Sequence, residues 1–167
     1  MSFQRKVNPD GSPKKHFTPQ QAKLKIASFC AYQERCQQEV RDKLYTYRLS
    51  GEEVEDILSF MIEEGFLNEE RFARAFVGGK FRIKKWGRNK ILQELKLRQI
   101  SPNCIKSGMK EINAEEYWET LLGLVEKKWD SLSDRDDFIR VQKVFRYLMS
   151  RGYEADIIQE AIEEVRK

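Results

Sequence analysis

The sequence is poor in the residues that small enzymes use for catalysis. Its only histidine is His16, which lies in a turn-rich N-terminal stretch where a solvated side chain is expected. Without that histidine, no Ser/His/Asp or Cys/His set can be assembled. The sequence also lacks the GxxxxGKS/T and GxGxxG loops that bind the phosphates of nucleotides. These absences argue against an enzyme, and we expect neither catalytic residues nor a cofactor.

Cysteines and long apolar runs are also scarce. Cys30, Cys36 and Cys104 are too few and too irregularly spaced for a disulfide framework, and they lack the CxxC spacing typical of zinc sites. We therefore expect reduced thiols, no metal site and a cytoplasmic protein. No stretch approaches the roughly 18 consecutive apolar residues of a membrane span. Residues 1–17 are basic and turn-rich without an apolar signal core, which predicts a disordered tail.

Charge is abundant but unevenly distributed. Charged residues make up 35% of the 167 residues, which suits an elongated array that exposes much of its surface. Residues 1–100 contain 20 Lys and Arg against 13 Asp and Glu, a net charge of +7. Residues 101–167 contain 11 against 14, a net charge of −3. An anionic partner is therefore expected to bind the first part of the chain.

Apolar residues repeat along the chain with a period near 50 residues. Six positions recur without a gap after 51 residues and again after a further 53. The three series are Val40, Leu44, Leu49, Val54, Leu58 and Met61; Ile91, Leu95, Ile100, Ile105, Met109 and Ile112; and Val144, Leu148, Tyr153, Ile158, Ile162 and Val165. A fixed period of this length is typical of tandem supersecondary units. Such arrays usually offer a surface to a partner rather than enclose a pocket.

Helix caps divide the repeat into three units of three helices each. Thr18-Pro19-Gln20-Gln21 and Ser50-Gly51-Glu52-Glu53 are capping boxes, and Ser101-Pro102 repeats the second cap 51 residues later. No strand pattern accompanies them. We predict an all-α fold, an elongated and curved array whose units span residues 18–66, 67–113 and 114–167.

The third unit departs from the first two. Glu154 stands where Ser50 and Ser101 supply caps, so this cap is lost. About seven extra residues lie between its first two helices, which we expect over residues 114–129 and 134–150. Its last helix is expected to end near residue 165.

One segment concentrates positive charge. Between Lys80 and Arg98 only Glu94 is acidic, so the net charge is +7 over 19 residues. The basic residues are Lys80, Arg82, Lys84, Lys85, Arg88, Lys90, Lys96 and Arg98. The segment is either a solvated helix face or a surface for an anionic partner, that is, phosphates or an acidic protein. Phe81 and Trp86 lie within it, and they either stack on bases or pack in the core.

A family resemblance is carried by residues 64–77. The signature of RecX, the bacterial regulator of the RecA recombinase, closely resembles Glu64-Gly65-Phe66-Leu67-Asn68-Glu69-Glu70-Arg71-Phe72-Ala73-Arg74-Ala75-Phe76-Val77. Similar patterns extend the resemblance over roughly residues 20–166. It implies tandem three-helix units and a non-enzymatic protein that binds along the RecA–DNA filament and restrains its recombinase and ATPase activity.

One turn departs from the RecX pattern. Members of the family tend to carry Arg-Gly before an aromatic or aliphatic residue there. Arg151-Gly152-Tyr153 keeps the glycine, whereas Tyr47-Arg48-Leu49 and Arg98-Gln99-Ile100 do not. The difference leaves the expected fold intact but bears on contacts of the first unit.

Our leading hypothesis is a monomeric modulator of the RecA nucleoprotein filament, with no membrane partner. It is expected to contact RecA and the phosphates of single- or double-stranded DNA. The residues assigned to this attraction are Lys80, Arg82, Lys84, Lys85, Arg88 and Lys90, with Arg98 in the same segment. Arg71 and Arg74 either form ion pairs with RecA or flank the unit.

Two other readings remain open. In one, the second and third helices of a unit form a helix-turn-helix that binds DNA directly. Acidic residues in the third helices, including Glu52, Glu53, Glu160 and Glu163, argue against it. In the other, the chain is a plain protein-interaction scaffold, for which the charges between Lys80 and Lys90 are unimportant.

Overall fold

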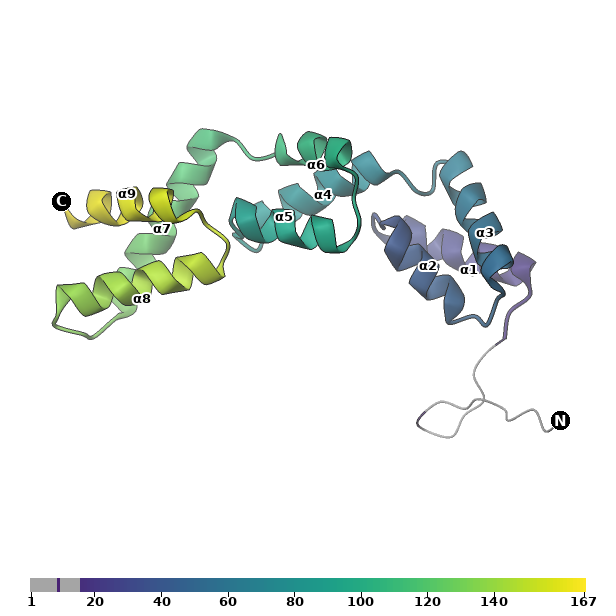
Figure 1. Ribbon diagram of the computed structural model, residues 1–167, viewed down its shortest axis with the longest axis horizontal. Helices are drawn as coiled ribbons and strands as arrows, with labels where there is room; N and C mark the ends of the chain where they lie inside the picture. Colours follow the sequence, from purple (N-terminus) through teal and green to yellow (C-terminus); the bar gives the residue numbers. More distant parts are fainter. Residues whose placement is uncertain (1–8, 10–15) are drawn as a thin grey trace. The chain divides into compact units, whose positions relative to one another are not determined.

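The described part of the chain is helical throughout its regular structure. A computed structural model describes residue 9 and residues 16–167, and these contain nine α-helices and no strand (Figure 1). The helices are α1 (Pro19–Tyr32), α2 (Gln37–Tyr45), α3 (Gly51–Glu63), α4 (Glu69–Arg82), α5 (Arg88–Leu97), α6 (Pro102–Met109), α7 (Ala114–Ser131), α8 (Asp137–Ser150) and α9 (Ala155–Arg166). The predicted all-α class is confirmed. Most of the predicted tail, residues 1–8 and 10–15, lies outside the described residues.

The chain divides into two compact bodies. One ends at Phe72, and the other begins at Ala73. The first contains α1–α3, which form the first three-helix unit. The second contains α5–α9 and most of α4, so the second and third three-helix units pack together within one body.

The first unit closes around one apolar core. Its buried centre includes Ala22, Ile26, Cys30, Val40, Leu44, Val54, Ile57, Leu58 and Met61. Both predicted capping boxes form. The Thr18 hydroxyl accepts from the Gln21 amide at 3.2 Å, and the Ser50 hydroxyl accepts from the Glu53 amide at 3.2 Å. The caps therefore begin α1 and α3 where the sequence predicts.

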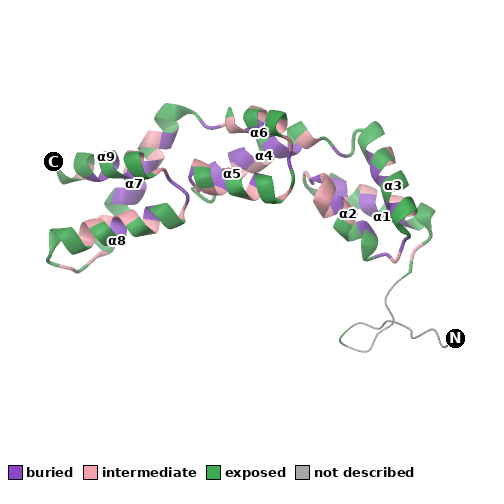
Figure 2. Ribbon diagram, in the orientation of Figure 1, coloured by how far each residue is buried: buried purple, intermediate pink, exposed green. Residues whose placement is uncertain are grey.

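The repeated apolar positions line the cores of all three units. Sixteen of the eighteen positions are buried, and only Met109 and Val165 are half-buried. Figure 2 shows the buried residues on the inner sides of the helices in each unit. This pattern follows from helix geometry, because residues three and four apart lie on one face. The tandem three-helix arrangement is confirmed.

The same turn joins the second and third helices of every unit. Arg48, Gln99 and Gly152 occupy equivalent positions there, with left-handed φ angles of 64°, 57° and 93°. A residue other than glycine adopts this conformation at a cost of about 1–2 kcal/mol. At Gly152, however, a Cβ would lie 2.3 Å from the Cβ of Lys90. The third unit therefore requires the glycine that the other two units do without.

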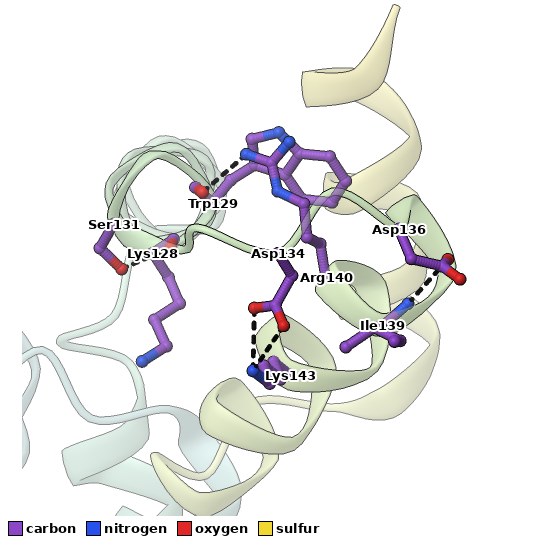
Figure 3. A network of polar contacts seen from close by, with 8 residues as sticks. All are labelled: Lys128, Trp129, Ser131, Asp134, Asp136, Ile139, Arg140 and Lys143. Carbon is purple, nitrogen blue, oxygen red and sulfur yellow. Dashed lines mark hydrogen bonds and ion pairs between the residues drawn. The ribbon is translucent and has the colours of Figure 1, made fainter.

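The third unit differs from its prediction in the connection between α7 and α8. α7 extends to Ser131, two residues beyond its predicted end near 129. α8 begins at Asp137, three residues after its predicted start near 134. The reason is that Asp136 caps α8, accepting from the Phe138 amide at 2.8 Å. Asp134 instead binds Lys143, as Figure 3 shows.

Candidate partner-binding surface

The basic segment spans the end of α4, the connection to α5 and α5 itself. α4 ends in a Schellman turn, in which Lys85 has a φ of 56° and the Trp86 amide donates to the Lys80 carbonyl at 3.1 Å. Lys84 and Lys85 are exposed, and neither ammonium group has a partner among the described residues. We call these two residues the lysine tip. It presents two adjacent positive charges to solvent.

The turn between α8 and α9 holds the backbone of the lysine tip. The Gly87 amide donates to the Arg151 carbonyl at 2.8 Å. The Tyr153 hydroxyl donates to the Lys85 carbonyl at 2.9 Å, and the Arg151 guanidinium donates to the Lys84 carbonyl. The third unit therefore fixes the backbone of the tip, while its side chains stay in solvent.

Two glycines allow the two main chains to approach this closely. A Cβ on Gly87 would lie 2.3 Å from the carbonyl carbon of Gly152, and a Cβ on Gly152 would lie 2.5 Å from the amide nitrogen of Lys90. The Asn89 amide also donates to the Gly152 carbonyl at 2.9 Å. Only a residue without a Cβ fits at either position.

Arg88 is engaged in the same contact. Its guanidinium Nη1 lies 3.2 Å from Glu154 Oε2, and its guanidinium carbon lies 3.9 Å from the centroid of the Tyr117 ring. The Tyr117 hydroxyl donates to Glu154 Oε1 at 2.7 Å and accepts from the Arg88 amide at 3.1 Å. We call Arg88, Tyr117 and Glu154 the clasp. It joins the start of α5 to α7 and α9.

Burial shapes the chemistry of the clasp. Burial raises the pKa of Tyr117 far above its ordinary value, and the hydrogen bond and charge of Glu154 add to the rise. The hydroxyl therefore remains a neutral donor at physiological pH. Tyr117 also packs between Phe81 and Tyr153, with ring centroids 5.7 and 5.1 Å away. Phe81 is thus a core residue, which settles its two predicted alternatives in favour of packing.

The ring of Trp86 contacts two further lysines. The ammonium groups of Lys80 and Lys90 lie 4.8 and 4.5 Å from the centroid of its ring. Such cation–π contacts contribute about 0.5–1 kcal/mol each at exposed sites. Trp86 is half-buried, so it supports these lysines at the surface.

The other arginines of the segment bind acids of the same body. The Arg82 guanidinium donates to the Glu111 carbonyl at 3.0 Å. Arg98 pairs with Glu94, with Nη1 and Oε2 2.7 Å apart. Lys96, by contrast, is exposed on α5 and has no partner among the described residues. The segment therefore divides into cations that hold the fold and cations that face solvent.

Arg71 and Arg74 lie at the start of α4. Arg71 Nε donates to Glu34 Oε1 at 2.5 Å, and its guanidinium donates to the Gly65 carbonyl at 3.0 Å. These contacts hold the connection between α3 and α4 within the first body. Arg74 is exposed and also makes a contact within the protein.

Two family descriptions match the chain in tandem. The description "RecX, second three-helix domain" matches residues 68–109, and "RecX, third three-helix domain" matches residues 115–162. Together these ranges cover all of α4, α5, α6 and α8, and most of α7 and α9.

The chain belongs to the RecX family.

Curated RecX proteins are similar over most of this chain. "Regulatory protein RecX" of Clostridium perfringens (strain 13 / Type A) is 31% identical over 124 residues, which are 73% of this chain and 58% of the relative. "Regulatory protein RecX" of Clostridium botulinum (strain Eklund 17B / Type B) is 32% identical over 132 residues, which are 78% of this chain and 61% of the relative. The chain thus spans about three fifths of the length of these relatives.

Solved RecX structures share the fold. The crystal structure of RecX from Lactobacillus salivarius superposes with a TM-score of 0.78 at 21% identity, covering 89% of this chain and 96% of that one. A second structure, titled "Crystal structure of regulatory protein RecX", has a TM-score of 0.79 at 20% identity, covering 87% and 73%. At these identities the likeness concerns the helical architecture.

In RecX terms, the clasp joins the second domain to the third. The sequence predictions did not include Tyr117 or Glu154. Glu154 stands where the first two units have a serine cap, and its carboxylate instead binds Arg88 and Tyr117. Among residues 16–167, no helix is long and apolar enough to cross a bilayer, and no cluster of side chains is suited to hold a metal ion.

Proposed function

We propose that this chain binds the RecA–DNA filament and restrains its recombinase and ATPase activity. The observation that carries the proposal is the lysine tip, two exposed cations on the rigidly held connection of the second RecX domain. The curated relatives are named regulatory proteins, and the resemblance to RecX implies RecA as the partner. A monomeric, cytoplasmic protein without enzymatic activity fits this role.

The candidate residues have different roles in the proposal. Exposed charge for DNA phosphates or acidic side chains of RecA comes from Lys84, Lys85 and Lys96. Lys80 and Lys90 add charge held in place by Trp86. Three arginines, Arg82, Arg88 and Arg98, maintain the shape of the surface through their ion pairs with acids. Arg71 supports the start of α4, and Arg74 adds charge beside it.

Restraint follows from competition for phosphates. Each phosphate that a protein cation neutralises releases condensed counterions, which favours binding and makes it weaken with salt. When cations of this chain bind the DNA phosphates of a filament, fewer phosphates remain accessible to other ligands. The incoming DNA strand therefore meets a partly covered filament, which lowers the rate of strand exchange.

Strand exchange and DNA-dependent ATP hydrolysis by RecA test the proposal. The wild-type chain at stoichiometric amounts is expected to slow both reactions and to co-sediment with RecA filaments. Lys84→Glu with Lys85→Glu is expected to lose both effects at about 0.15 M salt. Lys106→Glu with Lys110→Glu is the matched control, because both residues are exposed on the same domain and the charge change is equal.

Arg88 stays unchanged in this design, since its replacement would break the clasp and confuse folding with binding. A wild-type chain that leaves both RecA reactions unchanged at stoichiometric amounts contradicts the proposed function. Equal inhibition by the tip variant and the control variant contradicts the role of the lysine tip.

Direct binding by a helix-turn-helix is less well supported. It requires a third helix to enter a groove of DNA, where acidic side chains are repelled by phosphates. On α3, Glu52 and Asp56 are exposed, and on α9, Glu160 and Glu163 are exposed. Tight, sequence-selective binding to DNA without RecA would favour this alternative.

A further inference from the structure

The third RecX domain contains a basic groove outside the surface described above. The groove is shallow, with a volume of about 330 Å³, and lies along the end of α7 and one side of α8. It is lined by Lys128, Leu132, Lys143, Arg146, Tyr147 and Ser150. Residues 114–167 contain 9 Lys and Arg against 13 Asp and Glu. Three cations in one groove therefore stand out from a domain that is acidic overall.

The acids near the groove neutralise only part of this charge. Asp134 binds Lys143, with its carboxylate oxygens 2.8 and 2.9 Å from the ammonium nitrogen. Arg146 is exposed and has no partner among the described residues. Lys128 extends from the end of α7 on the side of the Asp134–Lys143 pair, as Figure 3 shows. Three positive charges and one negative charge leave the groove with a net charge of +2.

Tyr147 holds cations rather than offering an open ring. The Lys128 ammonium lies 4.8 Å from the centroid of its ring, and the Arg151 guanidinium lies 5.7 Å from it. Cations near the ring compete with a nucleobase for stacking. The groove therefore suits anionic oxygens, for which lysine and arginine are the usual protein partners.

We propose that this groove binds the backbone phosphates of DNA without regard to sequence. The cationic lining fits a phosphate backbone, and only Leu132 supplies an aliphatic surface for the side chains of a peptide. The proposal shares DNA as a partner with the proposed function. It does not require RecA, so DNA alone tests it.

The test measures binding of fluorescent single-stranded oligonucleotides by anisotropy between 0.05 and 0.2 M salt, conditions over which phosphate contacts respond strongly. Arg146→Gln removes one unpaired cation of the groove. It is expected to reduce the slope of log affinity against log salt by about 0.7, which corresponds to about fivefold weaker binding at 0.1 M salt. Two oligonucleotides of different sequence are expected to respond equally.

Lys127→Gln is the matched control. Lys127 is exposed on α7 and lies outside the groove, and the charge change is the same. Its salt slope is expected to equal that of the wild type. Asp134→Asn tests the opposite direction, because it releases Lys143 and is expected to tighten binding and steepen the slope.

Equal salt slopes for Arg146→Gln and Lys127→Gln overturn the proposal, as does a wild-type chain that does not bind DNA. Neither result contradicts a role of the lysine tip in RecA inhibition, because strand exchange and ATP hydrolysis test that role separately. Conversely, the groove could bind DNA while the chain has no effect on the RecA reactions. That result would contradict the proposed function and leave the groove proposal intact. Circular dichroism confirms that each variant keeps its helical content.

Discussion

Gly87→Ala isolates the contact between the second and third domains. Gly87 has φ −78° and ψ 167°, which alanine adopts without strain. The whole effect of the added methyl group therefore comes from its neighbours. Its Cβ would lie 2.3 Å from the carbonyl carbon of Gly152 and 2.4 Å from both the carbonyl oxygen of Gly152 and the amide nitrogen of Tyr153. These are backbone atoms, so the turn between α8 and α9 must move away.

The size of this movement sets the expected cost. Ordinary Cβ contacts begin near 3.4 Å, so the turn must retreat by about 1 Å. The hydrogen bonds from Gly87 to Arg151, 2.8 Å, and from Asn89 to Gly152, 2.9 Å, would then exceed hydrogen-bonding range. Each such bond contributes about 0.5–1.5 kcal/mol, and the loosened packing adds to the loss. We expect destabilisation by about 2–4 kcal/mol.

Tryptophan fluorescence during urea unfolding measures this effect. Trp86, Trp118 and Trp129 are the three tryptophans of the chain, and all lie in the body that begins at Ala73. Their signal therefore reports unfolding of the second and third domains. The expected result is a lower urea midpoint for Gly87→Ala.

Gly123→Ala serves as its control. Gly123 lies within α7, and a Cβ there would meet nothing within 4 Å. Alanine is preferred over glycine in a helix by about 0.5–1 kcal/mol, so this variant is expected to raise the midpoint. A Gly87→Ala midpoint at or above that of the wild type would refute the reasoning about the close contact.

Two more predictions concern polar groups. Tyr117→Phe removes the hydroxyl that binds both the Arg88 amide and the Glu154 carboxylate. We expect about 1–3 kcal/mol of destabilisation in the same fluorescence assay. An unchanged urea midpoint would contradict a stabilising role of the clasp. The hydrogen bond from Lys143 holds the pKa of Asp134 below its ordinary value, so the pair stabilises the fold at neutral pH and this contribution is lost as pH falls through the lowered pKa. In an NMR titration of the carboxyl carbon, Lys143→Gln is expected to return that pKa toward the ordinary value, and an unshifted titration would contradict the pairing.

The architecture was accessible from the sequence because its signals are local. A capping box needs only four consecutive residues, and the boxes at Thr18 and Ser50 begin α1 and α3 as expected. A core stripe needs only helical spacing, and the repeated positions are buried almost without exception. The start of α8 was placed less well, because Asp134 and Asp136 both resemble caps, but Asp136 caps the helix whereas Asp134 binds Lys143.

The basic surface was accessible only in part. Its position along the chain follows from the sequence, whereas the exposure of the lysine tip does not. The separate role of Arg88 does not, since its partner Glu154 lies 66 residues away. Gly87 directly precedes α5, and nothing local indicates that it faces Gly152.

The sequence by itself determined the helices, their caps and the threefold repeat, because hydrogen bonds and apolar faces within a helix depend on residues a few positions apart. Only the tertiary structure decided which cations face solvent. The clasp takes Arg88 out of the basic segment, and the packing of α7 with α8 gathers Lys128, Lys143 and Arg146 in a domain of negative net charge. Charge acts through space, so its effect depends on neighbours that sequence order does not reveal.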